Sequence, residues 1–409
     1  MKRLIIAIVA VSFACVFLNS CKKSTNVVNP GTSPVTTNNL HGFGLNAMTP
    51  QDLANVPSFS SSLFSNRLQP DGLTYNGTAY NSYLLVTPQI RDQGQLGACT
   101  GFCGAETDEI LYYYKNNSVQ PIANFTIANG IVLATQNEIP NTSEESYYGS
   151  GNTTAAAVSP LFLYFVERVV ISGGSIGSDP GANMVNIGET LQGLSNNSGS
   201  GKALTYNGYT FDGISNESLY KYPFVLGSGG YNVATATTAP YTTYPYNYFN
   251  YGTNIIPVAP NNFPIGTQSG STSSSGTTTE GYYVITDTKA ALIADVKTAL
   301  LNNKPVMMGF NVYDKGPSYS YFESLSTTSY TYNPLTSSGS LVSGIRLQGG
   351  HAVPIVGYIN DSTQPGGGVF ICQNSWGTPW GYHGYFYLPY SVITNTKIVP
   401  ASNLFVAII

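Results

Sequence analysis

Residues 90–102 read IRDQGQLGACTGF and place Gln93 six positions before Cys99. In residues 99–115 the acidic side chains of Glu106, Asp108 and Glu109 come before Lys115 at the end, which predicts a helix over 99–115 that begins at Cys99. A helix amino terminus lowers the pKa of a thiol and favours its nucleophilic thiolate form. Cys99 is therefore a candidate nucleophile.

Two later stretches supply groups that such a nucleophile needs. Residues 349–358 read GGHAVPIVGY and contain His351, and residues 373–386 read QNSWGTPWGYHGYF and contain Asn374. An imidazole can exchange a proton with a thiol through one ring nitrogen while an amide orients the other. His351 and Asn374 are the candidates for these two tasks.

An acyl-transfer reaction also needs donors for the oxyanion of its tetrahedral intermediate. The side-chain amide of Gln93 and the backbone N–H of Cys99 are suited to this task. Trp376 follows Asn374 by two residues and would shield the hydrogen bond between His351 and Asn374 from water.

Together the three stretches resemble the papain-like cysteine peptidases, over about residues 86–409. The resemblance implies an α+β fold of two lobes with the active site between them. A helical lobe would cover about 86–240, and a β-rich, barrel-like lobe would cover about 281–409. Helices are expected at 99–115, 158–171 and 287–303, with Ser159 and Asp287 opening the last two. Strands are expected at 305–313, 351–359 and 368–376.

The resemblance assigns the nucleophile to Cys99, the general base and acid to His351, the orienting amide to Asn374 and an oxyanion-hole donor to Gln93. It also implies that three small residues border the main specificity pocket, namely Gly349, Ala352 and Gly309. Trp376 and Trp380 are expected to be structural. The chain departs from the family at Leu96, where a disulfide cysteine is usual, and at Thr100, where an aromatic residue is usual.

Two further cysteines are expected near the site. Cys103 is four residues after Cys99 on one helix face, and Cys372 is two residues before Asn374 on one strand face. We expect Cys103 and Cys372 to lie close together, either as a disulfide or as two buried free thiols.

Composition narrows the possible partners. Charged residues make up only 9% of the 409 residues and the net charge is −4, which argues against nucleic acid. A zinc site built from Cys99, Cys103 and His351 would lack a fourth ligand, so we expect neither metal nor cofactor. We expect a monomer.

The first 21 residues have a basic start, an apolar run and a Cys at position 21 after a small residue, which is typical of a secretory signal. The end resembles a bacterial lipoprotein cleavage box, which implies lipidation of Cys21 and anchoring on a membrane in the periplasm or at the cell surface. An ordinary signal peptide is the alternative. Residues 22–85 lack the charged helices of the family's inhibitory prosegment, and we expect a flexible spacer or short prosegment.

The predicted function is hydrolysis of peptide bonds in a peptide or protein substrate through a thioester acyl-enzyme. Two alternatives stay open. One is a catalytically silent papain-fold surface protein that binds peptide or glycan, for which the abundant Tyr side chains would be suited. The other is acyl transfer to an amine through the same thioester.

Overall fold

The computed structural model describes residues 41–64, 74–75, 78–94, 96–139, 158–173, 180–194, 204–206, 209–211, 224–227, 230–233, 281–315 and 321–408. These residues all belong to one compact unit, Asn39–Ile409. The predicted signal, Cys21 and the first part of the predicted spacer lie outside the described residues.

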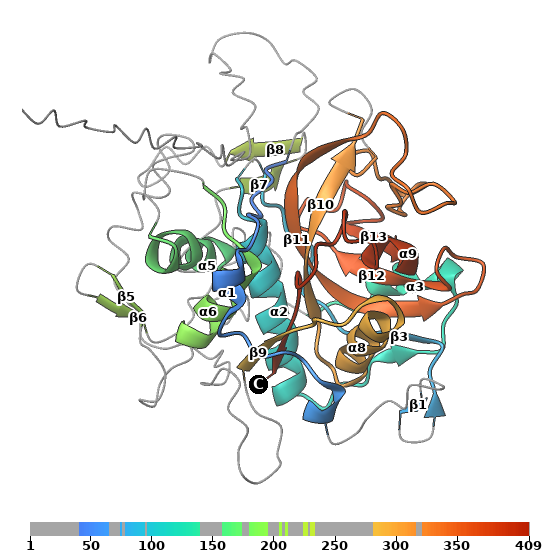
Figure 1. Ribbon diagram of the computed structural model, residues 1–409, viewed down its shortest axis with the longest axis horizontal. Helices are drawn as coiled ribbons and strands as arrows, with labels where there is room; N and C mark the ends of the chain where they lie inside the picture. The colour runs from blue at the N-terminus through green and yellow to red at the C-terminus, as the bar shows by residue number, and fades with distance from the viewer. Residues whose placement is uncertain are drawn as a thin grey trace, which may run out of the picture. The chain divides into compact units, whose positions relative to one another are not determined.

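Three helices gather on one side of the molecule (Figure 1). The longest, α2 (Cys99–Asn116), confirms the predicted helix and packs against α5 (Pro160–Phe165) and α6 (Met184–Leu194). Ser159 is the amino-terminal cap of α5, because its hydroxyl accepts a hydrogen bond from the Phe162 N–H at 3.1 Å. The predicted helix over 158–171 continues beyond α5 as a π-helical stretch, η2 (Val166–Ile171).

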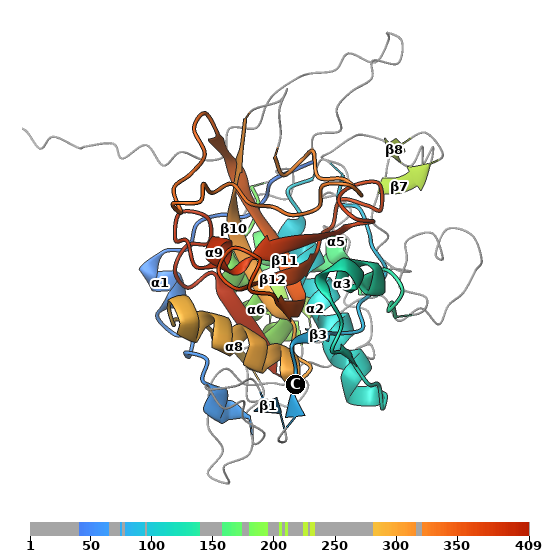
Figure 2. The ribbon, with the colours of Figure 1, turned by 90° about the vertical axis from the view of Figure 1, so that its right-hand side faces the viewer.

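One antiparallel sheet forms the opposite side of the molecule, and Figure 2 shows it from the side. Its strands run in the order β13-β12-β11-β10-β14-β9, with β3 pairing to β11 and β4 pairing to β3. Within the described residues the sheet is open, because β13 and β9 do not pair with each other. The fold is therefore α+β as predicted, but within the described residues the sheet is not a closed barrel. The main strands are β9 (Gly281–Val284), β10 (Val306–Asp314), β11 (Arg346–Asn360), β12 (Gly368–Gln373), β13 (Tyr385–Pro389) and β14 (Leu404–Ile408).

The sheet and α2 are joined by the long strand β11, which contacts both α2 and β10. Its first part pairs with β10, where His351 lies opposite Phe310, and its last part pairs with β12 and β3. Residues on both faces are buried over most of β10 and over β11 from Gly349 to Ile359, so burial in these stretches does not alternate along the strand. This burial holds His351 rigidly inside the protein.

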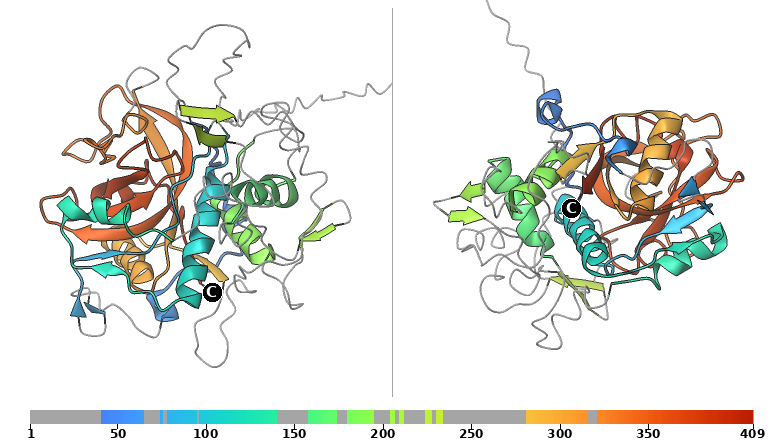
Figure 3. Two further views of the ribbon diagram at one scale, coloured as in Figure 1. Left: turned by 180° about the vertical axis from the view of Figure 1, so that it is seen from behind. Right: turned by 90° about the horizontal axis from the view of Figure 1, so that it is seen from below.

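Shorter elements surround this frame, as the two views of Figure 3 show. They are α1 (Pro50–Leu53), η1 (Ser61–Leu63), β1 (Thr74–Tyr75), β2 (Thr78–Ala79), β3 (Ser82–Leu84), β4 (Ile122–Ala123), α3 (Ile127–Ala134), β5 (Leu204–Tyr206), β6 (Tyr209–Phe211), β7 (Phe224–Gly227), β8 (Gly230–Val233), α8 (Lys289–Leu301) and α9 (Tyr390–Ile393). The predicted helix over 287–303 is α8, and its cap is Thr288 instead of Asp287. Among the described helices none is long and apolar enough to cross a membrane.

The free-thiol alternative for Cys103 and Cys372 is confirmed, whereas the expected close approach of the two side chains is not seen. Both side chains are buried free thiols, and they belong to different core clusters: Cys103 packs with α5 and α6, and Cys372 packs within the sheet. The prediction assumed a strand over 368–376, but β12 ends at Gln373. The alternation of strand faces therefore does not extend from Cys372 to Asn374.

Candidate active site

Cys99 is the first residue of α2, and its side chain is fully buried. It lies against the backbone N–H groups of Ala352, which follows His351 on β11, and of Gly44. Gly101 allows the start of α2 to pack closely against α5, since a Cβ at this position would lie only 2.5 Å from the Pro160 carbonyl oxygen. This close approach fixes the helix end that carries the thiol.

His351 and Asn374 meet directly. His351 Nε2 lies 2.7 Å from Asn374 Oδ1, and both side chains are buried. Since an amide oxygen only accepts, His351 carries its hydrogen on Nε2. His351 Nδ1 has no hydrogen-bond partner among the described residues and is left for proton exchange. The Trp376 ring lies 5.1 Å from the imidazole and shields this hydrogen bond from water.

Other aromatic rings enclose the imidazole. Phe310 of β10 and Phe322 lie 5.7 and 5.8 Å from the His351 ring. Trp380 packs against Phe322 with the two rings tilted by 53°, and it donates its Nε1–H to the Phe322 carbonyl at 2.9 Å. Trp376 and Trp380 thus both belong to the packing around His351.

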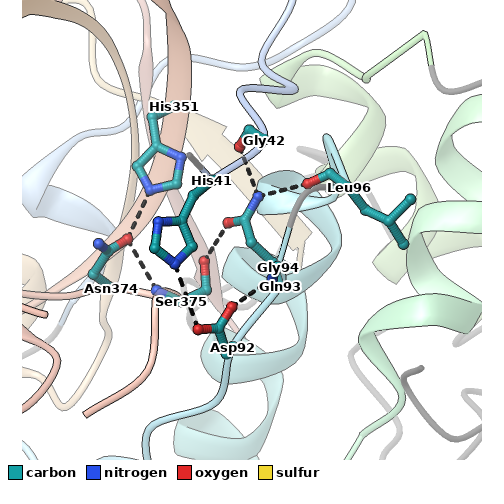
Figure 4. A network of polar contacts seen from close by, with 9 residues as sticks. All are labelled: His41, Gly42, Asp92, Gln93, Gly94, Leu96, His351, Asn374 and Ser375. Atoms are coloured by element: carbon teal, nitrogen blue, oxygen red, sulfur yellow. Dashed lines mark hydrogen bonds and ion pairs between the residues drawn. The ribbon is translucent and has the colours of Figure 1, made fainter. Parts of the chain in front are cut away.

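Gln93 is oriented by a hydrogen-bond network (Figure 4). Its Nε2 donates to the carbonyl of Leu96 at 2.8 Å and to that of Gly42 at 2.9 Å. Its Oε1 accepts from the Ser375 hydroxyl at 2.7 Å, and the Ser375 N–H donates to Asn374 Oδ1 at 2.9 Å. Ser375 therefore links the orientations of Gln93 and Asn374, and the Gln93 donor is occupied by a carbonyl of residue 42.

A short stretch of the amino-terminal part, residues 41–46, passes directly over these groups. Its contacts to the rest of the protein are Gly42 N to Gly94 O at 3.1 Å, Leu45 N to Gly350 O at 3.1 Å, Ala182 N to Gly44 O at 2.9 Å and Asn46 N to Ala182 O at 2.8 Å. The 41–46 segment therefore covers Cys99 and occupies the space that a substrate would need.

Glycines make this close passage feasible. A Cβ at Gly44 would lie 1.7 Å from the Gly97 carbonyl oxygen, and one at Gly181 would lie 2.1 Å from the Gly44 carbonyl oxygen. A Cβ at Gly349 would meet the Phe43 side chain at 2.6 Å, and one at Gly350 would meet the Leu45 carbonyl oxygen at 2.5 Å. Side chains at these positions would leave no room for the segment.

The expected pocket residues lie beside the 41–46 segment. Leu45 is buried in the cluster that also contains Cys99 and Ala352, and a Cβ on Gly309 would lie 2.9 Å from the Leu45 side chain. Ala352 and Gly309 thus border the space that Leu45 fills, whereas Gly349 contacts Phe43.

Burial keeps the thiol and the imidazole uncharged in this state. It raises the pKa of Cys99 to about 12, although the N–H groups of Gly44 and Ala352 act in the opposite direction. Burial also lowers the pKa of His351 to about 4, against the effect of the Asn374 hydrogen bond. At neutral pH the site is therefore a neutral thiol beside a neutral imidazole.

Comparison with known proteins shows similarity to one protein family over part of the chain. Residues 212–402 match the family model of the papain family cysteine proteases, a range that includes His351 and Asn374 but begins after Gln93 and Cys99. This range is less than half of the chain. The fold of this papain-like domain is similar to that of xylellain, a cysteine protease from Xylella fastidiosa, with a TM-score of 0.51 at 20% identity, covering 92% of this chain and 98% of that one.

Two curated proteins share part of this papain-like domain. An uncharacterized peptidase C1-like protein of Acanthamoeba polyphaga mimivirus is 33% identical over 107 residues, which are 26% of this chain and 29% of that protein. A cathepsin B-like protein of Giardia intestinalis is 35% identical over 91 residues, which are 22% of this chain and 24% of that protein. The chain thus spans less than a third of the length of these relatives.

Two residues of this site, His41 and Ser375, were not predicted from the sequence. His41 in fact stacks on Trp376, with ring centroids 4.4 Å apart. The glycines at 42 and 44 around Phe43 were the available signal, because close backbone approach needs them. Among the described residues no group of three or more His, Cys, Asp or Glu side chains is arranged to hold a metal ion.

Proposed function

We propose that the chain is a cysteine peptidase that hydrolyses peptide bonds in peptides or proteins through a thioester. The observation that carries the proposal is the contact of His351 Nε2 with Asn374 Oδ1 at 2.7 Å, beside a cysteine at the start of a helix. This combination provides a nucleophile, a proton carrier and its orienting group.

In the proposed reaction Cys99 gives its proton to His351 Nδ1, and its sulfur bonds to the substrate carbonyl carbon. The carbonyl oxygen becomes an oxyanion, which accepts hydrogen bonds from Gln93 Nε2 and the Cys99 N–H. Collapse breaks the carbon–nitrogen bond, and His351 protonates the leaving amine. Water then attacks the thioester, returns a proton to His351 and releases the acid with regeneration of Cys99.

The described state is the resting state of this proposed enzyme. The Gly42 carbonyl occupies the Gln93 donor, and the 41–46 segment covers Cys99. Leu45 pairs with Ala182 in the parallel sense, with Ala182 N–H donating to Gly44 O and Asn46 N–H donating to Ala182 O. Cys99 faces the backbone N–H of Gly44, so the segment blocks the thiol.

We also propose that the protein is held on a membrane through a lipidated Cys21, on the extracytoplasmic side. The support is the amino-terminal sequence, which has a basic start, an apolar run and a Cys at position 21. Metabolic labelling with a palmitate analogue tests this, since labelling should disappear in Cys21→Ala.

The activity is tested with a mixed peptide library under mild reductant, read by mass spectrometry. The full chain carries Gly44→Ala, which removes the fit of the 41–46 segment, and the matched control carries Cys99→Ala in addition. Cleavage that depends on Cys99 supports the proposal. Equal cleavage by both proteins, or no cleavage by either, would contradict the proposal. Products in which an amine instead of water has been added to the acyl group would identify acyl transfer.

A further inference from the structure

Among the ring contacts of Trp376 with the described residues, the one with His41 of the 41–46 segment is parallel, whereas His351 and Phe43 are inclined to the indole by 44° and 64°. His41 stacks on it with an interplanar angle of 9° and a centroid distance of 4.4 Å. The rings of Phe322 and Trp380 approach Trp376 steeply, at 72° and 76°. If the segment leaves, a flat aromatic surface is uncovered next to His351.

A buried carboxylate lies at the edge of this surface. Asp92 precedes the oxyanion donor Gln93, and its backbone forms a bridge with Trp376. One carboxylate oxygen, Oδ1, accepts the N–H of Gly94. The other, Oδ2, accepts no hydrogen bond from the described residues and lies 3.5 Å from His41 Nε2, with the Asp92 side chain only 3% exposed.

The charged groups around His41 favour a cation at this point. Asp92 contacts the imidazole directly, and Glu323 interacts with it electrostatically. Burial raises the pKa of Glu323 to about 7, which His41 counteracts. Arg91, next to Asp92 in the sequence, is paired with Glu109 at 2.8 Å, and His351 has its pKa lowered to about 4 by burial and is neutral near pH 7. Among the described residues a cation therefore meets carboxyl groups here, and the neighbouring Arg91 guanidinium is already paired with Glu109.

We propose that Trp376 and Asp92 form a substrate subsite for a planar cationic side chain, the guanidinium of arginine or the imidazolium of histidine. Such a group can stack on the indole and direct an in-plane N–H to Asp92 Oδ2. In the resting state His41 occupies this place, stacked on the indole with Nε2 3.5 Å from Asp92 Oδ2. A lysine carries the charge without a flat face, and a glutamine has a flat amide without the charge.

The subsite belongs to the leaving-group side of the scissile bond. The other end of the segment, at Leu45, fills the space bordered by Ala352 and Gly309, which the family resemblance assigns to the main specificity pocket. His41 lies beyond Gly42, whose carbonyl is bound by Gln93, in the opposite direction along the site. This inference rests on the proposed peptidase function for the direction of the substrate.

The test uses the full chain with Gly44→Ala and peptides that differ only at one of the first three positions after the cleaved bond. That position carries arginine, citrulline, lysine or alanine, since citrulline keeps the planar shape of arginine without its charge. We expect arginine to exceed citrulline about tenfold in kcat/KM at one position. In Asp92→Asn, which keeps an acceptor for the Gly94 N–H, this ratio should fall to near one.

A binding measurement separates this inference from the proposed function. The chain has only two tryptophans, so in Gly44→Ala with Cys99→Ala the fluorescence reports on ligands near Trp376. Tighter binding of arginine than of citrulline peptides, lost in Asp92→Asn, supports the subsite even if no peptide is cleaved. Cleavage or binding with equal preference for arginine and citrulline overturns the subsite and leaves the peptidase proposal intact.

A second pair of variants keeps Asp92 unchanged. His41→Arg presents the proposed preferred group to the subsite, and His41→Gln presents a neutral amide. In the otherwise unaltered chain, alkylation of Cys99 should be several-fold slower in His41→Arg than in His41→Gln, because the segment is held more tightly. Equal rates, with both proteins folded by circular dichroism, would contradict the subsite.

Discussion

Replacing Gly44 by alanine should expose Cys99 without unfolding the protein. The added Cβ would lie 1.7 Å from the Gly97 carbonyl oxygen, and real Cβ contacts stay above 3.0 Å. The obstacle is backbone, so it cannot rotate away as a side chain would. The segment must therefore move outward by more than about an ångström at this point.

The cost of this movement follows from the neighbouring contacts. The hydrogen bonds from Ala182 N to Gly44 O, at 2.9 Å, and from Leu45 N to Gly350 O, at 3.1 Å, flank the new methyl group. Each is worth about 0.5–1.5 kcal/mol, so their loss destabilises the closed state by about 1–3 kcal/mol. The population with an accessible site should rise about 5- to 150-fold.

Alkylation by iodoacetamide, resolved by mass spectrometry of peptides, measures this opening. The rate at Cys99 should rise by the same factor, whereas Cys103 and Cys372 are buried elsewhere in the core and serve as internal standards. Ala47→Ser, at an exposed position next to the segment, is the matched control. An unchanged Cys99 rate in Gly44→Ala, or equal acceleration at all three thiols, would refute this reasoning.

Three further predictions concern positioning and stability. Ser375→Ala removes the donor to Gln93 Oε1 and should lower kcat about 2- to 13-fold in the Gly44→Ala background with little change in KM, as measured by steady-state kinetics. If Gln93→Ala lowers kcat by the same factor whether residue 375 is Ser or Ala, the two side chains act independently and the link is contradicted. Glu109→Ala removes the buried carboxylate that pairs with Arg91 at 2.8 Å, and it should lower the free energy of unfolding in urea by about 3–5 kcal/mol. A decrease of less than about 1 kcal/mol would contradict the contribution of this ion pair. Burial raises the pKa of Glu106 and Glu167 to about 8, so the native state keeps protons that the unfolded chain releases above about pH 4.3, and stability should fall as the pH rises to about 8. The fall should be smaller in Glu167→Gln, and an identical pH profile of urea unfolding in the two proteins would show that Glu167 does not contribute.

Local sequence features predicted many of the helices and strands around the site. The helix over 99–115, the Ser159 cap and the strands at 305–313 and 351–359 are features of neighbouring residues, and the structure confirms them. The strand predicted over 368–376 was too long, because Asn374 and Ser375 leave β12 to bind His351 and Gln93. Side-chain demands at a site override the preference for an extended strand there.

The sequence by itself predicted the chemistry proposed for this protein, since Gln93, Cys99, His351 and Asn374 are recognisable from residue type and local context. The tertiary structure decided what surrounds them. It separated Cys103 from Cys372, left the sheet open and brought His41 onto Trp376. These outcomes depend on contacts between residues far apart in the chain, which no periodicity or local propensity encodes. The need for glycine at position 44 follows only from the tertiary structure, because the backbone of Gly97 leaves no room for a Cβ there.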